Sequence, residues 1–448
     1  MKAPGPSPDW LALDRAHVWH PYTQMQTAPP ALPVVRAEGV WLELADGRRV
    51  LDGISSWWVN LFGHNHPRLN AALAAQAAAL EQVIFAGFTH EPAARLAAEL
   101  VALAPAGLSR VFYSDDGSTA VEVAMKMAIQ QWRQRGEARR RIFVGLDHAY
   151  HGDTFGAMAA GGDPVFHRGF ADLLCEVLRA PVPACESEVA AALAALDVLL
   201  ERAGDEVAAV IVEPIVQGAG GMRLHPSSFL RGVREATRAR GLPLIADEIF
   251  TGFGRTGRMF ACEHAGVAPD LLCLSKGLTG GYLPLAATLA TEEIYSAFLS
   301  AGRGRAFFHG HSYTGNALAC AVARASLALF DETNCLHRVA ELQRLFSRRL
   351  AVIQALPGVA RVRGLGALAV VELEAPAADR ESGYLDARGP RLAQEFLDRG
   401  VLLRPLGNVI YFLPPYAITD DECHLVFDVV EETLLGSRLP GSRRMTAR

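Results

Sequence analysis

Four short stretches of the sequence place reactive or phosphate-binding residue types directly after apolar, strand-like runs. Lys276 follows "DLLCLS", and Asp247 ends the run "LPLIAD". Gly117 and Ser118 of "YSDDGSTAVEVAMK" stand where a helical pattern begins, and Tyr150 of "LDHAYHGD" follows another apolar run. The start of a helix favours phosphate because its first N–H groups are free and its dipole is positive there. Together the stretches offer an amine, an acid, a phosphate site and an aromatic face.

Each stretch also has an ordinary structural interpretation. A lysine before glycines is typical of a surface turn, and Gly117 and Ser118 are typical of a helix N-terminus. Asp247 could pair with a nearby arginine such as Arg255, and Tyr150 could pack in the core. Ligands of open α/β sheets, however, bind outside the carboxyl ends of the strands, and all four stretches fall there. Their common placement favours one binding site.

One cofactor would use all four stretches. Pyridoxal phosphate needs a lysine for a Schiff base, an acid that keeps the pyridine nitrogen protonated, a phosphate cradle and an aromatic face. A buried Asp247 would need a cationic partner, because an unpaired buried carboxylate is costly. A pocket of low dielectric would lower the pKa of Lys276 and let it act as a base. We therefore predict pyridoxal 5'-phosphate as the cofactor and Lys276, Asp247 and Tyr150 as catalytic residues.

The elements around these residues predict an α/β fold with two domains. Between about residues 107 and 290, short β-rich runs alternate with helical patterns, which indicates a mostly parallel sheet covered by helices. Near the N-terminus, "GVWLEL" and "RVLDGISSWW" have the pattern of short strands, and the C-terminal part is mixed helix and strand. We expect a large cofactor-binding domain over 66–330. Residues 1–65 and 331–448 are expected to form a smaller α+β domain from both chain ends.

Composition narrows the class of protein. The net charge of -5 over 448 residues gives no reason to expect nucleic acid or an anionic membrane as a partner. The seven cysteines are scattered without a CxxC pair, which predicts reduced thiols in a cytoplasmic protein. No apolar run reaches the roughly 18 residues of a membrane span. Histidines such as those of "HGH" have no nearby carboxylates, so no metal is expected.

The motifs also carry a family resemblance. "LIADEIFTGFGRTGRMFACEH" and "PDLLCLSKGLTGGYLPLAATLAT" resemble the class III aminotransferases of fold type I, and the resemblance runs from about residue 14 to 435. "HVWHPYTQM", "DGISSWWVNLFGHNHP" and "RPLGNVIYFLPP" are similar to the branch that converts 8-amino-7-oxononanoate to 7,8-diaminononanoate in biotin synthesis. The resemblance implies a homodimer with active sites at the subunit interface. The alternative is another ω-amino-acid aminotransferase, such as an acetylornithine or ornithine type, against which the aromatic blocks "WHPYT" and "SSWW" argue.

The resemblance implies a set of cofactor contacts. They are Gly117, Ser118, Tyr150, Gln217, Asp247, Lys276, His311 and Ser312. In this set Lys276 is the Schiff-base lysine, and Gln217 is expected near the cofactor's phenolic oxygen. His311 and Ser312 are expected to come from the neighbouring subunit, although "HGHS" stands where "HGPT" is common.

The substrate pocket implied by the resemblance is aromatic with one cation. Its positions are Tyr22, Trp57, Gly310 and Arg404. An arginine suits a keto acid with a distal carboxylate, because it binds carboxylate bidentately. Asp116 of "SDDGS" replaces the serine of many relatives, so its carboxylate must point away from the phosphate or cap the helix.

The amino donor is the least determined feature. Family frequency favours S-adenosylmethionine, whose sulfonium cation would suit aromatic faces. However, "GGYLPLA" and "HGHSYTGN" resemble a subset of the family that takes lysine. Both donors stay open at the level of the sequence.

Overall fold

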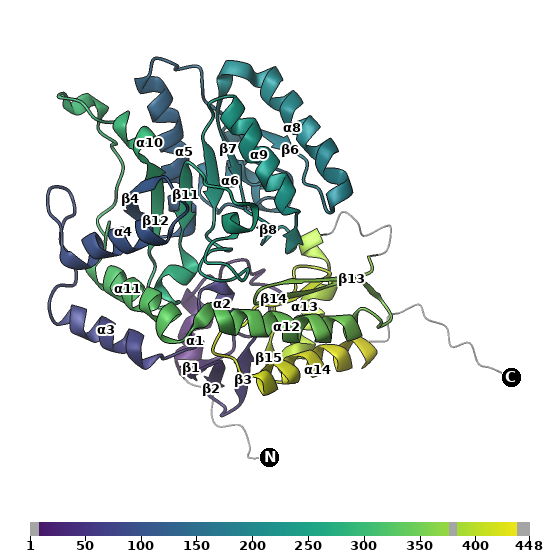
Figure 1. The fold of residues 1–448 in the computed structure, drawn as a ribbon. Coiled ribbons are helices and arrows are strands. Elements are labelled where there is room, and N and C mark those ends of the chain that lie inside the picture. Colours follow the sequence, from purple (N-terminus) through teal and green to yellow (C-terminus); the bar gives the residue numbers. More distant parts are fainter. Residues whose placement is uncertain (1–8, 376–382, 437–448) are drawn as a thin grey trace.

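The structure is a computed structural model that describes residues 9–375 and 383–436. A seven-stranded sheet forms the centre of its upper part in Figure 1. Its order is β4 (Leu108–Ser114), β12 (Ala286–Thr291), β11 (Leu271–Leu274), β10 (Leu244–Asp247), β7 (Val207–Val212), β5 (Ile142–Leu146) and β6 (Val177–Ala180). Strands β11, β10, β7, β5 and β6 pair in parallel, and only β12 pairs antiparallel with its neighbours within the described sheet. The mostly parallel sheet predicted from the sequence is confirmed.

Helices cover this sheet, which explains its uniformly apolar strands. Every residue of β7, β10 and β11 is buried, as in parallel sheets that are covered on both faces. The covering helices are α4 (Glu91–Leu103), α5 (Gly117–Gln134), α6 (Phe155–Ala160), α8 (Val189–Ala203), α9 (Ser227–Ala239) and α10 (Glu292–Ser296) (Figure 1). The short helix α7 (Pro164–His167) follows α6 and contacts it. Helix α5 packs on β11 and β12, so its first turn lies beside the ends of the central strands.

Segments from the two halves of the chain, residues 34–52 and 359–436, lie together in the lower part of Figure 1. One sheet has the order β1 (Val34–Glu38), β2 (Trp41–Leu44), β3 (Arg49–Asp52) and β15 (Val401–Leu402), and β15 lies parallel to β3. A second sheet contains β13 (Val359–Leu365), β14 (Leu368–Leu373) and β16 (Val409–Phe412). Helices α12 (Cys335–Ile353), α13 (Arg388–Asp398) and α14 (Asp420–Gly436) accompany these sheets. The domain boundaries near residues 65 and 330 stay a prediction.

The remaining helices and strands lie outside the three sheets described above. They are α1 (Trp10–His17), α2 (Ser55–Trp58), α3 (Pro67–Ala77), α11 (Ala317–Glu332) and the ribbon of β8 (Val216–Gln217) and β9 (Arg223–Leu224). The prediction that "RVLDGISSWW" continues as a strand is wrong. Strand β3 ends at Asp52, and α2 is a left-handed turn in which all four residues have positive φ, between 45° and 76°. A left-handed conformation costs roughly 1–2 kcal/mol per residue, so other contacts must hold it.

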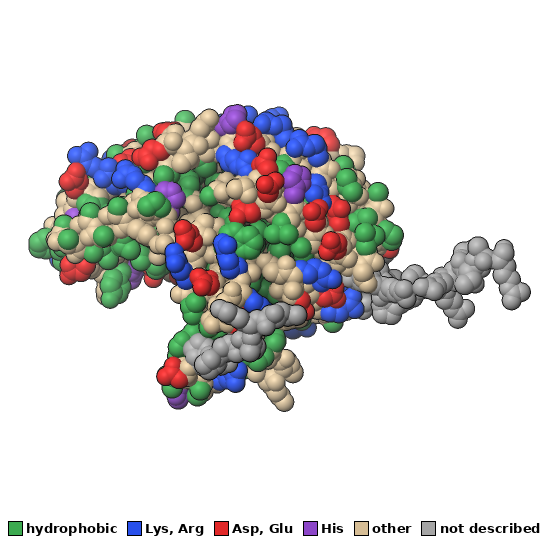
Figure 2. Space-filling model, turned by 90° about the horizontal axis from the view of Figure 1, so that it is seen from below, with side chains coloured by type: hydrophobic (Ala, Val, Ile, Leu, Met, Phe, Trp, Pro, Cys, Tyr) green, Lys and Arg blue, Asp and Glu red, His purple; other side chains and the backbone are tan. Residues whose placement is uncertain are grey.

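The surface mixes charges of both signs (Figure 2), and the cysteines form no disulfide. Figure 2 shows basic and acidic side chains interspersed on the face seen from below. All seven cysteines are free thiols, and five of them are buried. Within residues 9–375 and 383–436, no helix is long and apolar enough to cross a membrane. The same residues contain no group of three side chains that could hold a metal ion.

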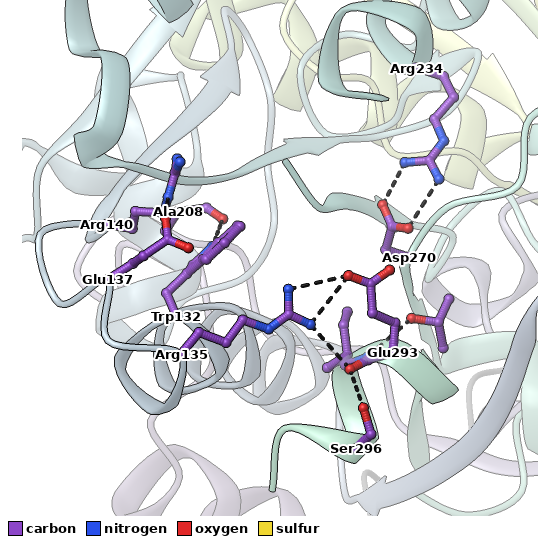
Figure 3. Close-up of polar contacts among 11 residues, drawn as sticks. Trp132, Arg135, Glu137, Arg140, Ala208, Arg234, Asp270, Glu293 and Ser296 are labelled. Atoms are coloured by element: carbon purple, nitrogen blue, oxygen red, sulfur yellow. Dashed lines mark hydrogen bonds and ion pairs between the residues drawn. The ribbon is translucent and has the colours of Figure 1, made fainter. Parts of the chain in front are cut away.

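Ion pairs hold the amino-terminal edge of the large sheet, where the parallel strands begin. Asp270 directly precedes β11, and its carboxylate accepts a forked pair of hydrogen bonds from Arg234 of α9 (Figure 3). The same carboxylate accepts the backbone N–H of Leu244 at the start of β10, at 2.8 Å. One acidic side chain therefore joins a helix to two strands.

A second group of contacts at the amino-terminal edge of the sheet is centred on Trp132 of α5. Its indole N–H donates to the Ala208 carbonyl of β7 at 2.7 Å, and the guanidinium carbon of Arg140 lies 4.4 Å from the ring centroid (Figure 3). Arg135 lies 5.5 Å from the same ring and pairs with Glu293 beyond β12. These contacts pair charged and aromatic groups of this edge with one another.

Candidate active site

The carboxyl ends of the strands open into a cavity of about 730 Å³. Five of the residues predicted from the sequence line it: Gly117, Ser118, Tyr150, Asp247 and Lys276. They come from four separate elements, namely the first turn of α5, the loop after β5 and the ends of β10 and β11. The topology therefore brings together residues that are as far as 159 positions apart (Gly117 to Lys276).

Lys276 enters this cavity directly after β11. Its backbone is left-handed, with a φ of 44°, and its Nζ lies 4.8 Å from the ring centroid of Trp58. Burial lowers the pKa of Lys276, while the negative charge of Asp247 opposes that shift. An amine whose pKa is lowered is neutral more often, and only the neutral form acts as a nucleophile or base.

Asp247 pairs with a histidine that the sequence reasoning missed. Its Oδ2 lies 2.7 Å from His151 Nδ1, and its Oδ1 accepts the backbone N–H of Ile249. The arginine considered as its alternative partner, Arg255, instead donates to the Pro414 carbonyl. The only signal for His151 was its place beside the tyrosine in "AYHGD".

A buried nitrogen of this histidine has no partner in the described residues. His151 Nε2 is enclosed and makes no hydrogen bond within 9–375 and 383–436. With Nδ1 directed to Asp247, the imidazole orients the carboxylate. This geometry suits an acid that must hold a proton on a ring nitrogen in the cavity.

The start of α5 is shaped for close approach of an anion. Asp116 caps the helix by accepting the N–H of Thr119 at 2.9 Å, which is one of the two arrangements expected for it. A Cβ on Gly117 would lie 2.8 Å from the Ile249 side chain. A Cβ on Gly152 would lie 2.3 Å from Ser118 Oγ. The two glycines therefore permit a tight cradle at the helix N-terminus, and the lysine, acid and cradle together fit pyridoxal phosphate.

Glu213 supports the loop that carries Tyr150. Its two carboxylate oxygens accept the backbone N–H groups of Tyr150 and Gly218, each at 3.0 Å. Burial raises the pKa of Glu213 to about 7, with His151 opposing the shift and Asp247 adding to it. Sequence reasoning passed over this carboxylate, because "VEP" has no distinctive spacing.

Gln217 does not line the cavity. Its side-chain amide donates to the Asp147 carbonyl at 2.8 Å, and its Oε1 is buried without a partner in the described part of the chain. The structure therefore does not bring Gln217 together with the other predicted cofactor residues.

The segment predicted to serve a neighbouring subunit also lies outside the cavity of its own chain. His311 Nε2 is 3.8 Å from Asp115, and the Ser312 carbonyl accepts a hydrogen bond from Gln82. Gly310 is exposed. Their roles stay predictions.

A second cavity of about 270 Å³ adjoins the first and shares Lys276 with it. Its walls are Pro21, Tyr22, Trp57, Trp58, Tyr150, Phe166, Ala219, Lys276, Tyr384, Arg404, Leu406 and Tyr411. The guanidinium carbon of Arg404 lies 4.8 Å from the Trp57 ring centroid, and the Tyr22 ring lies 5.3 Å from Trp57. Three of the four predicted substrate positions thus form an aromatic slot with one cation.

A hydrogen-bonded chain joins the two cavities. The hydroxyl of Tyr22 lies 3.0 Å from that of Tyr150 and donates to the Asp153 carboxylate. Burial, with the nearby Asp153, raises the pKa of Tyr22 to about 12, so this phenol stays protonated near neutral pH. Asp153 is a further residue that sequence reasoning missed.

Comparisons with known proteins agree with this geometry. The model of the family "Aminotransferase class-III" matches residues 22–434. The chain is 51% identical to the adenosylmethionine-8-amino-7-oxononanoate aminotransferase of Synechococcus elongatus, over 93% of this chain and 98% of that protein. It is 44% identical to the protein of the same name from Geobacter sulfurreducens, over 95% and 96%.

Solved structures give the same result. The crystal structure of the enzyme of that name from Methanocaldococcus jannaschii matches with a TM-score of 0.89 and 39% identity, covering 94% of this chain and 98% of that one. An amine transaminase of an uncultivated Pseudomonas species, solved in its PLP-bound form, matches with a TM-score of 0.87 and 34% identity, over 94% and 98%.

Proposed function

Because the chain belongs to the class III aminotransferases, we propose that it transfers an amino group to 8-amino-7-oxononanoate and forms 7,8-diaminononanoate for biotin synthesis. The observation that carries this proposal is the aromatic slot beside Lys276, with Arg404 stacked on Trp57. An apolar slot with one cation suits a long-chain keto acid. The name shared by the relatives at 38–51% identity supports the same substrate.

The first cavity holds the cofactor in this proposal. When bound, pyridoxal phosphate supplies a protonated ring that accepts electron density from the substrate carbon. Asp247 keeps the proton on the ring nitrogen, with His151 orienting its carboxylate. Gly117 and Ser118 would hold the phosphate at the start of α5, and Tyr150 would offer its aromatic face to the ring.

Lys276 moves the proton. Its lowered pKa lets the neutral amine take a proton from the amino-bearing carbon of the donor. In the second half of the reaction it returns a proton to the acceptor carbon that receives the amino group.

Arg404 binds the carboxylate of the keto acid. Arg404→Met should raise the KM for the keto-acid substrate about ten- to hundredfold, because a charge-assisted hydrogen bond contributes about 1.5–3 kcal/mol. Cofactor content, measured by absorbance, should stay at the wild-type level. An unchanged KM would assign the carboxylate to another anchor.

Two assays test the function itself. Purified holoenzyme is given 8-amino-7-oxononanoate or an N-acetylornithine-type substrate in parallel, and the amine product is quantified. We expect turnover of the first substrate alone. Efficient turnover of the acetylornithine-type substrate with none of the first would establish the alternative aminotransferase.

The donor is proposed to be S-adenosylmethionine, with lysine as the competing candidate. Aromatic walls at Tyr22, Trp57 and Tyr150 suit a sulfonium cation, and a linear ω-ammonium chain fits the same walls. Each amine is mixed alone with holoenzyme, and the absorbance band of the lysine-bound cofactor is followed. Loss of the band with S-adenosylmethionine supports the proposal. If only lysine causes the loss, lysine is the donor and the proposed donor is wrong.

The proposed assembly is a homodimer. Large apolar side chains at Ile84, Phe88, Phe308 and Tyr313 are exposed. They belong to two segments joined by hydrogen bonds, including Gln82 to the Ser312 carbonyl at 2.9 Å. A second copy would cover this surface and bring His311 and Ser312 to its neighbour's phosphate site. Sedimentation at micromolar concentration tests this, and a monomer would contradict it.

The proposed location is the cytoplasm, where seven free thiols stay reduced. Fractionation of cells that produce the protein tests this assignment.

A further inference from the structure

The left-handed turn α2 presents two adjacent indoles to the two cavities. Trp58 is buried and lies under Lys276, and Trp57 is half-buried and lines only the aromatic slot. A right-handed helix or a strand would direct neighbouring side chains to different faces. The two rings line adjoining cavities, so the backbone of this turn sets the position of both.

A buried carboxylate holds this backbone from below. Asp52 is fully buried, and its Oδ1 accepts the backbone N–H groups of Ile54 and Ser56, at 3.2 and 2.9 Å. Its Oδ2 accepts the Ser56 hydroxyl at 2.7 Å and lies 2.9 Å from His64 Nε2. Burial pushes the pKa of Asp52 up, but the hydrogen bonds from His64 and Ser56 outweigh it and lower the pKa.

His64 reaches this carboxylate from outside the active site. Its side chain is 18% exposed and lines an outer groove with Arg36, Asn65 and Tyr282. Tyr282 also lines the first cavity, so the groove lies on the other side of its wall. His64 touches neither of the two proposed ligand cavities.

Trp57 depends on this support more than Trp58 does. The indole N–H of Trp58 donates to the Tyr411 hydroxyl at 3.2 Å, and its ring packs against Phe250. Trp57 contacts Tyr22 and Arg404, two residues of the slot itself.

We propose that Asp52 and His64 are positioning residues for keto-acid specificity, which hold the left-handed turn so that Trp57 aligns Arg404 and closes the slot. The inference rests on the proposed function for its substrate. It predicts an effect on the KM for the keto acid that is separate from cofactor binding.

The variants for the test are His64→Leu, which removes the donor, and His64→Gln, which keeps an N–H group. His337→Leu is the matched control, since His337 also faces a carboxylate (Glu341, 3.7 Å) but lies on the surface of α12. Each holoenzyme is measured for KM, kcat, cofactor absorbance and thermal midpoint. If His64→Leu does not fold, Asp52→Asn is measured in its place.

We expect His64→Leu to raise the KM for the keto acid about tenfold or more, since small misplacements at a site have large effects. Its kcat should stay within about threefold and its cofactor content unchanged. His64→Gln should recover most of the KM, and His337→Leu should match the wild type. An unchanged KM overturns the proposal. So does a KM that rises only together with loss of cofactor and of thermal stability, since that result marks a purely structural role.

A double-mutant cycle with Trp57→Phe tests the route. If His64 acts through Trp57, the KM effects of the two changes are less than multiplicative. Independent effects overturn the proposal.

Near-ultraviolet circular dichroism separates this inference from the proposed function. His64→Leu should alter the tryptophan signal without any substrate, and the change should shrink in the Trp57→Phe background. If the wild type does not turn over 8-amino-7-oxononanoate, the proposed function fails while the dichroism still decides the positioning role. An unaltered signal overturns it.

Discussion

The two edges of the large sheet differ in how far their polar groups are paired by hydrogen bonds. At the amino-terminal edge, Asp270 accepts hydrogen bonds from both terminal guanidinium nitrogens of Arg234 and from a backbone N–H, and only Arg234 Nε of this group has no partner among the described residues (Figure 3). At the carboxyl edge, the Lys276 amine faces an indole, and His151 Nε2 is buried without a hydrogen-bond partner among the described residues. Polar groups with hydrogen-bond partners stabilise the folded protein, whereas buried polar groups without partners beside a cavity can bind a ligand. Changes at the first edge should therefore alter stability, and changes at the second should alter chemistry.

The largest expected effect is at the carboxyl edge. Lys276→Ala removes the amine that binds the cofactor and moves the proton, so kcat should fall about ten-thousandfold or more. The thermal midpoint of the cofactor-free protein should stay close to wild type, because a partly buried cation is removed and no ion pair is broken. Substantial turnover by Lys276→Ala would end the assignment.

Asp247→Asn should have the next largest effect. The amide cannot hold the ring proton as the carboxylate does, and the loss of such electrostatic stabilisation is about 3–4 kcal/mol, or roughly 10²–10³ in kcat. Pre-steady-state kinetics of the half-reaction measure it. Asp247→Asn with a near-normal rate would mean that another group carries the charge.

At the amino-terminal edge the comparison predicts a loss of stability alone. Asp270→Ala leaves Arg234 and the Leu244 N–H without their acceptor, which should lower the free energy of unfolding by about 2–3 kcal/mol. The kcat of the folded enzyme should not change. Glu293→Ala is the control, since its pair with Arg135 is largely exposed and should contribute within about 0.5 kcal/mol. A change in kcat for Asp270→Ala with intact stability would break the distinction between the edges.

The smallest effect is a pH dependence at Glu213. Its pKa is raised from 4.5 to about 7 by burial, so the folded state binds this proton more tightly than the unfolded state. Its contribution to stability is then present below pH 4.5 and is lost as pH rises through about 7. The stability of Glu213→Gln relative to wild type should therefore increase between pH 4.5 and 7, measured by denaturant unfolding of the cofactor-free protein. If the difference in unfolding free energy between Glu213→Gln and wild type is constant over this pH range, the pKa of Glu213 is not raised.

The predictable part of the site follows from local pattern. Asp247 and Lys276 each end a run of four or more buried strand residues, so a parallel sheet places both at one edge whatever the packing details. Asp116 followed by Gly117 and Ser118 is likewise a local helix start, and its cap is confirmed. Such features depend on neighbours within a few residues.

The contacts of the residues that sequence reasoning missed, and those of Gln217, connect distant segments. His151 meets Asp247 across 96 positions, and Glu213 supports Tyr150 across 63. Gln217 stands in a motif that suggests a cofactor contact, yet its amide turns to the Asp147 carbonyl. No short-range pattern specifies these partners.

Local sequence was enough to specify the chemistry: a lysine, an acid and a helix start after buried strands indicated the cofactor, and longer motifs carried the resemblance to the family. The construction of the substrate slot, in contrast, was set by packing between distant segments. The "SSWW" block has β-strand character and no glycine, so local preference disfavours a left-handed turn. Asp52, His64 and the Leu413 carbonyl impose that turn through hydrogen bonds that reach up to 358 positions along the chain. Asp52 and His64 act within 12 positions, whereas the Leu413 contact forms only when both chain ends have packed. Local pattern alone therefore does not specify the turn.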